Sequence, residues 1–321
     1  MESAHSRRAP RWQTGTVIVV VCPGQGSQTP GFLSPWLEEP SYAAHLAELS
    51  DAAGVDLVRH GTESDADTIR DTAVAQPLIV AAGLMTLRAL SADGGRDRIG
   101  GIAGHSVGEL TAAAGAGVLS EQDAMRLVAV RGSAMAEAAA LEETGMSAVL
   151  GGQAEALDAK LAELGLSPAN VNGGGQVVVA GARDALAKLA EEPPRGARVV
   201  PLQVAGAFHT AYMSPAVDRL AEAAASLEVH DPGLPLWTNN DGTIVDSGAR
   251  YLELIVGQVS SPVRWDLCME SFADRGVTGI IELAPAGALV GLAKRGLRGV
   301  PAVAVKTPDD LAAARDLLDA A

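Results

Sequence analysis

Residues 98–115 read RIGGIAGHSVGELTAAAG, and this stretch carries the features that decide the fold. Arg98–Ala103 is a short apolar run typical of a buried strand, and the alanine-rich stretch Glu109–Gly115 is typical of a helix. Between them, Gly104–Gly108 has the form G-x-S-x-G. A strand, a glycine-flanked turn and a helix in this order predict an α/β fold with a serine displayed at the end of a strand.

The turn also predicts a nucleophile. Its glycines permit a sharp strand-to-helix turn that a Cβ would block, so Ser106 is forced outward at a helix N-terminus. The backbone N–H of Val107 then points to where the oxyanion of a tetrahedral intermediate would form. The alternative interpretation is a glycine-rich turn with an idle serine.

A serine hydroxyl needs a base before it can act as a nucleophile, and six histidines are available. His209 follows the apolar segment 204–208 and precedes a predicted helix that begins near Met213. A histidine at such a position can face the same crevice as Ser106, and the alternative is a histidine satisfied within the core. His45 lies on a predicted early helix and is expected to face solvent.

One arginine lies on the apolar stripe of a predicted helix. Ser120 opens this helix with a capping-box-like pattern, and the helix runs to about Ala140. Leu127, Arg131 and Met135 share one face, so the guanidinium points into the interior, where an unpaired charge is costly. Its partner is either a protein carboxylate or a substrate carboxylate bound by the guanidinium fork.

Patterns along the rest of the chain predict two parts. Val17–Cys22 (VIVVVC) is a buried strand, and short strands and helices alternate within 143–205, which predicts a small ferredoxin-like α+β insertion. We expect a loose extension over 1–15, a parallel-sheet α/β core formed by 16–142 and 206–321, and the inserted subdomain 143–205. The predicted elements of the insertion are Met146–Leu150, Ala154–Leu164, Gln176–Ala180, Arg183–Ala190 and Ala197–Gln203, and later core strands are predicted at Trp237–Asn239, Gly279–Leu283 and Pro301–Val305.

Composition excludes several classes of protein. With 39 acidic and 24 basic residues among 321, the net charge is −15, which argues against a free-standing nucleic-acid binder. Only two cysteines occur, Cys22 and Cys268, as expected in a reducing compartment, and their spacing offers no metal site. No apolar run approaches the roughly 20 residues that a membrane span needs. We therefore expect a cytoplasmic enzyme that binds neither nucleic acid nor membrane.

Several motifs occur in the order in which they occur in one known family. They are Pro23–Gln28 (PGQGSQ), Gly104–Leu110 (GHSVGEL), Val130–Gly132 (VRG), Asn172–Gly181 (NGGGQVVVAG), Ala207–His209 (AFH), Ser261–Trp265 (SPVRW) and Gly291–Arg295 (GLAKR). In these segments the chain resembles the malonyl-CoA:acyl carrier protein transacylases of the bacterial stand-alone type and the related acyltransferase domains of polyketide synthases. The resemblance covers nearly the whole chain after about residue 16.

The resemblance implies a role for each matching residue. Ser106 is similar to the family's nucleophile and His209 to its base, while the backbone carbonyl of Gln258 would orient the imidazole in place of a triad acid. The backbone N–H groups of Gln25 and Val107 would form the oxyanion hole. The implied fold is an α/β-hydrolase-like core with a parallel sheet plus the inserted ferredoxin-like subdomain.

The resemblance also implies the substrate and the partner. Arg131 would hold the malonyl carboxylate, and the group would pass from coenzyme A to the phosphopantetheine thiol of an acyl carrier protein by a ping-pong mechanism through a malonyl-serine ester. Coenzyme A thioester is then a substrate, so no cofactor is expected, and we expect a monomer that serves fatty-acid biosynthesis. Val107 and Phe208 resemble the residues of malonyl-selective relatives, and Phe208 would crowd the extra methyl group of methylmalonyl.

Other interpretations stay open. The carrier protein could belong to a polyketide pathway, which would make the chain a trans-acting acyltransferase. The same serine and histidine could use water, as in a serine acyl-thioester hydrolase, or the chain could be a non-catalytic docking module. Lys294, Arg295 and Arg298 either supply local positive charge for an acidic carrier protein or coenzyme A phosphates, or form an ordinary solvated helix end.

Overall fold

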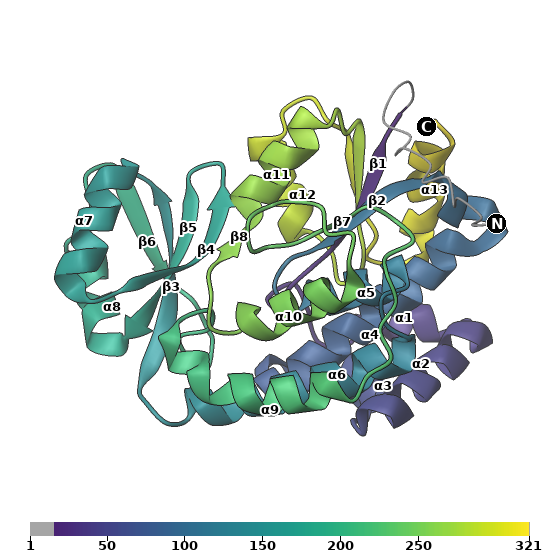
Figure 1. Ribbon diagram of the computed structural model, residues 1–321, viewed down its shortest axis with the longest axis horizontal. Helices are drawn as coiled ribbons and strands as arrows, with labels where there is room; N and C mark the ends of the chain where they lie inside the picture. Colours follow the sequence, from purple (N-terminus) through teal and green to yellow (C-terminus); the bar gives the residue numbers. More distant parts are fainter. Residues whose placement is uncertain (1–15, 321) are drawn as a thin grey trace, which may run out of the picture.

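A five-stranded parallel sheet, here the first sheet, lies in the right-hand part of the computed structural model, which describes residues 16–320 (Figure 1). Its strand order is β10-β9-β1-β2-β7, and every adjacent pair runs parallel. Each strand lies where the sequence predicts one. The strands are β1 (Ile18–Cys22), β2 (Ile99–Gly104), β7 (Leu236–Trp237), β9 (Gly279–Glu282) and β10 (Ala302–Ala304).

Helices cover both faces of this sheet, which explains why β1 is apolar at every position. Ile18, Val20 and Cys22 pack in the larger core, whereas Val19 and Val21 pack in a second core on the opposite face. The helices of this part are α1 (Ser34–Leu37), α2 (Pro40–Ala53), α3 (Leu57–Thr62), α4 (Thr72–Ser91), α5 (Gly108–Ala116), α6 (Glu121–Ala139), α9 (Ser214–Ala225), α10 (Gly248–Gln258), α11 (Trp265–Asp274), α12 (Ala288–Gly296) and α13 (Leu311–Asp319).

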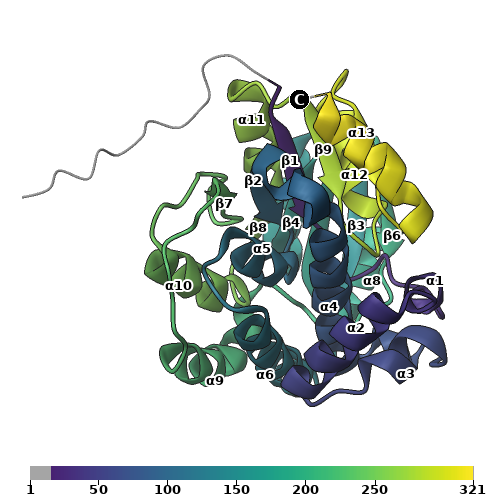
Figure 2. The same ribbon diagram turned by 90° about the vertical axis from the view of Figure 1, so that its right-hand side faces the viewer.

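The helix α4 is the central helix of the larger core. Among the described residues it is the one helix that is long and apolar enough to cross a membrane, and no such run is predicted from the sequence. However, 83% of its apolar window is buried inside the protein. Figure 2 shows it flanked by α2, α5 and α6, and all three contact it. Its apolar composition therefore reflects burial in the core.

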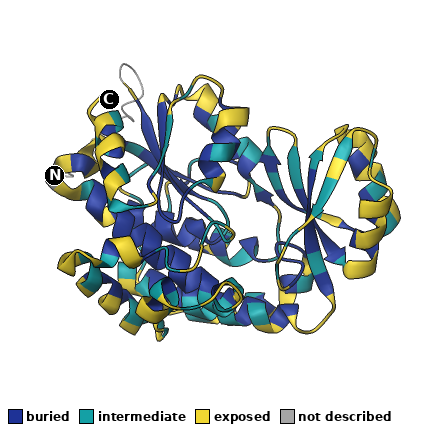
Figure 3. Cartoon of the chain, turned by 180° about the vertical axis from the view of Figure 1, so that it is seen from behind, coloured by how far each residue is buried: buried dark blue, intermediate teal, exposed yellow. Residues whose placement is uncertain are grey.

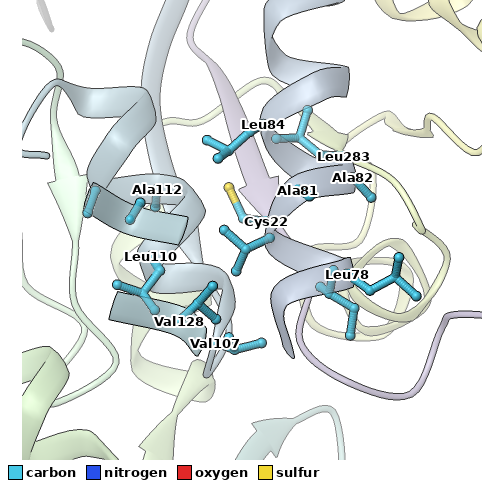
Figure 4. Packing of buried hydrophobic residues seen from close by; sticks show 14 of the residues in the cluster. Cys22, Leu78, Ala81, Ala82, Leu84, Val107, Leu110, Ala112, Val128 and Leu283 are labelled. Carbon is cyan, nitrogen blue, oxygen red and sulfur yellow. The ribbon is translucent and has the colours of Figure 1, made fainter. Parts of the chain in front are cut away.

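The larger core reaches the turn that carries the candidate nucleophile. Figure 4 shows Cys22 at the end of β1 among Leu78 and Leu84 of α4, with Val107 and Leu110 nearby at the start of α5. All five side chains are buried. In Figure 3 the buried residues concentrate in the first sheet and around α4, while the outer helices show exposed faces. Close packing in the larger core thus fixes the position of the turn.

A second sheet lies beside the first, and the helices α7 and α8 cover it on the side away from the core (Figure 1). Its order is β6-β3-β5-β4-β8, and the chain order β3-α7-β4-β5-α8-β6 places two helices among four antiparallel strands. The elements are β3 (Thr144–Gly151), α7 (Ala154–Leu164), β4 (Ser167–Gly173), β5 (Gln176–Ala182), α8 (Arg183–Glu191), β6 (Ala197–Pro201) and β8 (Val263–Arg264).

Two strands of this sheet differ from the predictions. The strand Ser167–Gly173 is not predicted from the sequence, because this segment holds Pro168 and two asparagines in place of an apolar run. The short strand Val263–Arg264 pairs parallel with β4 although it lies outside 143–205. The second sheet therefore takes one strand from the later part of the chain. The predicted extension 1–15 lies outside the described residues.

The prediction that His45 faces solvent is wrong. Its side chain is buried, and its ring Nε2 lies 2.7 Å from a carboxylate oxygen of Glu121. The reason is that α2 packs against α6, which begins at Glu121. His45 is therefore a core histidine with a carboxylate partner, far in the chain from the candidate base.

Candidate active site

The candidate nucleophile Ser106 lies in the turn between β2 and α5, with a backbone φ of 53°. This left-handed conformation is unusual for a residue with a side chain. The residues on both sides must be glycines because there is no room for a Cβ at either position. A Cβ on Gly104 would collide with the backbone of Gly108, and a Cβ on Gly108 would collide with the backbone carbonyl of Cys22. The turn is therefore as sharp as the sequence motif predicts.

The structure brings His209 to this serine. Ser106 Oγ lies 2.7 Å from His209 Nε2, and His209 Nδ1 donates to the backbone carbonyl of Gln258 at 2.8 Å. Because a carbonyl can only accept, Nδ1 carries the proton and Nε2 is left to accept the serine hydroxyl proton. The backbone of His209 also has a positive φ, 61°, and its N–H donates to the carbonyl of Val259.

The imidazole of His209 is held in its neutral form. Burial, and after it the nearby positive charge of Arg131, lowers the pKa of this imidazole to about 3. Only 4% of His209 is exposed. A neutral imidazole with Nε2 on a serine hydroxyl is the form that can take up the serine proton.

The two candidate oxyanion donors lie at the same cavity. The backbone N–H groups of Gln25 and Val107 have no acceptor among residues 16–320. The N–H of Ser106, by contrast, donates to Asn239 Oδ1 at 2.8 Å. The side chain of Gln25 is anchored to the carbonyl of Arg70 at 3.0 Å, which fixes the turn that carries its backbone. Two unpaired N–H groups beside one hydroxyl are the arrangement that stabilises a developing oxyanion.

These groups open into one cavity of about 450 Å³ between the first and second sheets, referred to below as the central cavity. Phe208 lines it together with the candidate pair and the oxyanion donors. Further lining side chains come from α4, α6, the turn after β2, the second sheet with the segment after β6, and α12: Gln76, His105, Met135, Met146, Asn170, Asn172, Gln176, Val178, Leu202, Val204, Leu289, Leu292 and Arg295. Within residues 16–320, no group of three or more His, Cys, Asp or Glu side chains could hold a metal ion.

Arg131 lies behind the wall of the central cavity and is 1% exposed. Its Nη1 donates to Gln76 Oε1 at 2.7 Å and its Nη2 to Gln258 Oε1 at 2.9 Å, while its Nε–H has no partner among the described residues. No described carboxylate forms an ion pair with it. The protein-carboxylate alternative for this arginine thus lacks a direct partner, and the guanidinium retains a free donor.

Sequence reasoning missed three polar residues that hold the site together. Asn239 accepts the Ser106 N–H and donates to the carbonyl of Gly104 at 2.6 Å. Gln76 and Glu109 are both buried: Gln76 accepts directly from the candidate clamp, and Glu109 accepts from Gln258, the clamp's other partner. For Asn239 the signal was present, because a polar residue at the end of a predicted core strand lies at the edge where sites form. Gln76 and Glu109 lie on helices with no such mark.

The predicted basic residues lie at the end of α12. Lys294, Arg295 and Arg298 are exposed, and Arg295 lines the central cavity and donates to Gln176 Oε1 at 2.7 Å. A second contact crosses the cavity, where the ring of His105 lies 2.9 Å from Asn172 Oδ1. Of the three basic residues, Arg295 is therefore the one that lines the cavity.

Comparison with known proteins decides the family. The model of the acyl transferase domain matches residues 19–310. The curated malonyl CoA-acyl carrier protein transacylase of Mycobacterium bovis is 52% identical over 298 residues, which cover 92% of this chain and 98% of that protein. This chain belongs to the malonyl CoA-acyl carrier protein transacylase family.

Solved structures of relatives have the same fold as this transacylase-family chain. The crystal structure of MCAT from Mycobacterium tuberculosis is 51% identical, with a TM-score of 0.90, over 94% of this chain and 99% of that one. A second structure, described as a type II PKS acyl-carrier protein in complex with its malonyl-transacylase, is 32% identical, with a TM-score of 0.89, over 94% and 99% of the two chains. The α/β fold with a parallel sheet is thus shared with the transacylase family.

Proposed function

We propose that this chain is an acyl carrier protein S-malonyltransferase, which moves malonyl from coenzyme A to the phosphopantetheine thiol of a carrier protein. One observation carries the proposal beyond family membership. The Ser106 hydroxyl is hydrogen-bonded to a neutral His209 in a cavity that is backed by a buried guanidinium with an unpaired N–H. This combination suits covalent catalysis on an acyl group that bears its own carboxylate.

In the first half-reaction His209 Nε2 takes the proton of Ser106 Oγ as this oxygen attacks the thioester carbonyl. The carbonyl oxygen becomes an oxyanion, which the backbone N–H groups of Gln25 and Val107 stabilise. Removal of one such donor costs about 10²–10³ in rate in other enzymes. The C–S bond then breaks, His209 returns the proton to the leaving sulfur, and a malonyl-serine ester remains.

In the second half-reaction the carrier protein thiol takes the place of coenzyme A. His209 accepts the thiol proton, the sulfur attacks the ester carbonyl, and the proton passes back to Ser106 Oγ as the C–O bond breaks. The carbonyl of Gln258 holds the imidazole through Nδ1 in both steps, as a triad acid would in a hydrolase. The same groups thus serve both half-reactions, which gives ping-pong kinetics.

Arg131 would select the malonyl group. A substrate carboxylate can form charge-assisted bonds to the guanidinium once the Gln76 amide moves aside. Among the described residues the Gln76 side-chain nitrogen donates only to the sulfur of Met135, at 3.4 Å, and the bond that its oxygen accepts from Arg131 would be replaced by one to the substrate carboxylate. Phe208 borders the cavity and would crowd the extra methyl of methylmalonyl, a discrimination of about 1–3 kcal/mol.

We further propose that the two sheets correspond to an α/β-hydrolase-like core and a ferredoxin-like subdomain, with boundaries near residues 142 and 206. The order β3-α7-β4-β5-α8-β6 supports the ferredoxin-like assignment. We also propose that the enzyme acts as a cytoplasmic monomer without a cofactor and serves fatty-acid biosynthesis. The carrier protein would be recognised through the exposed residues Lys294, Arg295 and Arg298, of which Arg295 lines the cavity.

Incubation of the purified chain with malonyl-CoA, followed by intact-mass analysis, tests the proposal. A malonyl adduct should form on the enzyme and transfer to a holo carrier protein when that protein is added. Consumption of malonyl-CoA without any thiol acceptor would instead identify a hydrolase, and the absence of an adduct would identify a docking module. Because one relative is described with a type II PKS carrier protein, fatty-acid and polyketide carriers should be compared in parallel.

A further inference from the structure

Glu109 is a buried ionisable residue that the proposed mechanism does not use. It is the second residue of α5, three positions after the candidate nucleophile, and 1% of it is exposed. Burial raises its pKa to about 8, while its hydrogen bonds and the positive charge of Arg131 oppose this rise. Burial of a carboxyl group costs free energy unless hydrogen-bond partners compensate for the lost water. Its contacts indicate the role of this group.

Both oxygens of this carboxyl group accept hydrogen bonds from residues that touch the candidate catalytic pair. Oε1 accepts the backbone N–H of Asn239 at 2.6 Å, and Asn239 in turn accepts the N–H of Ser106. Oε2 accepts from the side-chain amide of Gln258, whose backbone carbonyl holds His209. The carboxyl group is thus connected to Ser106 through one residue, Asn239, and to His209 through one residue, Gln258.

The contact with Gln258 decides which way its amide faces. The Nε2 of this amide donates to Glu109, so the Oε1 at its other side faces Arg131 and accepts from Nη2 at 2.9 Å. A glutamine amide has a donor side and an acceptor side, and Glu109 presents an accepting oxygen to the donor side. The same Nε2 also lies 3.3 Å from Asn239 Oδ1, so Glu109 is the nearer of its two acceptors. Without an acceptor at residue 109, the amide could turn and direct its N–H groups at the guanidinium, which has only donors.

The same arrangement keeps two buried ionisable groups apart. Glu109 and Arg131 are both about 1% exposed, yet no direct ion pair joins them, since the neutral amide of Gln258 lies between. Direct pairing would occupy the guanidinium and block a substrate carboxylate. The interposed amide leaves the guanidinium free for a ligand while the Glu109 carboxyl group stays one side chain away.

We infer that Glu109 is a positioning residue for acyl-group selection: it fixes the Gln258 amide so that Arg131 stays oriented and available for a substrate carboxylate. This inference rests on the proposed function, because it requires Arg131 to bind the malonyl carboxylate. It goes further by assigning the selection to a three-residue relay, Glu109, Gln258 and Arg131.

Two substitutions test the relay. In Glu109→Gln, the new amide can donate to Gln258 Oε1 and turn it, so the guanidinium loses an acceptor. In Gln258→Glu, a carboxylate meets Arg131 directly, while the backbone carbonyl that holds His209 remains. Both should lower the rate of malonyl-enzyme formation about 10-fold or more relative to the rate of acetyl-enzyme formation, the effect of losing a charge-assisted hydrogen bond.

The measurement is rapid-quench intact-mass analysis with malonyl-CoA and acetyl-CoA on the full chain, and the readout is the ratio of the two acylation rates. Glu253→Gln is the matched control, since this exposed carboxylate pairs with Arg250 on α10 and should leave the ratio unchanged. Glu109→Asp keeps the acceptor and should retain more malonyl preference than Glu109→Gln.

Equal loss of both rates in Glu109→Gln, or an unchanged ratio in Gln258→Glu, would overturn the inference, since a merely structural carboxyl affects both acyl groups alike. If Glu109→Gln does not fold, as judged by thermal unfolding, the Gln258→Glu ratio still decides. Arg131→Ala separates the two levels of argument. If that variant keeps the malonyl preference, the proposed clamp fails, whereas a lost preference there with an unchanged ratio in the other variants defeats only the relay.

Discussion

Ser106 and His209 both hold left-handed backbone conformations, with φ of 53° and 61°, and their side chains meet with Oγ and Nε2 2.7 Å apart. Residues with side chains avoid this region, and each such residue costs of order 1–3 kcal/mol. The surrounding packing imposes it at both positions. The hydroxyl and the imidazole are therefore aligned before any substrate arrives.

The first prediction concerns the covalent intermediate. Ser106→Ala should remove the malonyl adduct entirely, because no other group accepts the acyl chain in the proposed mechanism. Intact-mass analysis after incubation with malonyl-CoA measures this directly. Ser226→Ala, at the end of α9, is a suitable control and should still form the adduct. A malonylated Ser106→Ala protein would refute the assignment.

The second prediction follows from the low pKa of His209, about 3 in the folded protein against an ordinary value of 6.5. The base is neutral above pH 5, so the rate of malonyl-enzyme formation should stay level between pH 7 and pH 5. A histidine of ordinary pKa would lose about 30-fold over this range. Rapid-quench acylation across these pH values distinguishes the two outcomes.

The same group affects stability with a defined sign. Between about pH 6.5 and pH 3 the unfolded chain binds a proton on His209 and the folded chain does not, so this residue makes the protein less stable as the pH falls through that window. His209→Gln should flatten the pH dependence of the unfolding midpoint there. A steeper dependence in the variant would contradict the assigned burial effect.

The third prediction concerns substrate choice. Arg131→Ala should slow malonyl transfer by about 10–100-fold, the effect of losing a charge-assisted pair, and leave acetyl transfer equal or faster. Arg131→Lys should recover only part of the malonyl rate, because an ammonium lacks the planar fork. Competition between malonyl-CoA and acetyl-CoA gives the ratio, and an unchanged ratio would disprove the clamp.

The fourth prediction concerns the turn itself. Gly108→Ala should destabilise the protein severely, since the new Cβ meets the backbone carbonyl of Cys22, which cannot move without displacing β1. Gly257→Ala is the matched control, a glycine within α10 with open space around the added Cβ. It should raise the free energy of unfolding by about 1 kcal/mol. Thermal unfolding of both variants checks the contrast.

The fold was readable from the sequence where one rule governs a segment. The β-branched run of β1 and the glycine turn before α5 each admit a single local structure, and the predicted helix capped by Ser120 is confirmed as α6, with Ser120 Oγ accepting the N–H of Asp123. The strand Ser167–Gly173 was missed because Asn170 and Asn172 line the cavity. These polar side chains interrupt the apolar pattern that marks a strand.

The candidate site was predictable only in part. The motif around Ser106 marks itself locally, but the position of His209 alone left a core histidine equally open. Glu109 shows the limit most clearly, since a glutamate on the first turn of a helix is ordinarily a solvated residue that favours the helix dipole. Its role depends on Gln258, 149 positions later in the chain, and no local pattern encodes that contact.

The pairing of the short strand Val263–Arg264 with β4 has a consequence for how reactants enter. Val263 and Arg264 pair with β4 in the second sheet, and the N–H of Arg264 also donates to the carbonyl of Asn239, just after β7 of the first sheet, so main-chain hydrogen bonds connect the two sheets here. Such a connection restricts the large hinge motions by which other enzymes open the cleft between two domains. Acyl groups would then reach the serine on a long, thin and flexible group that enters a cavity of fixed width, and the pantetheine chain has this shape.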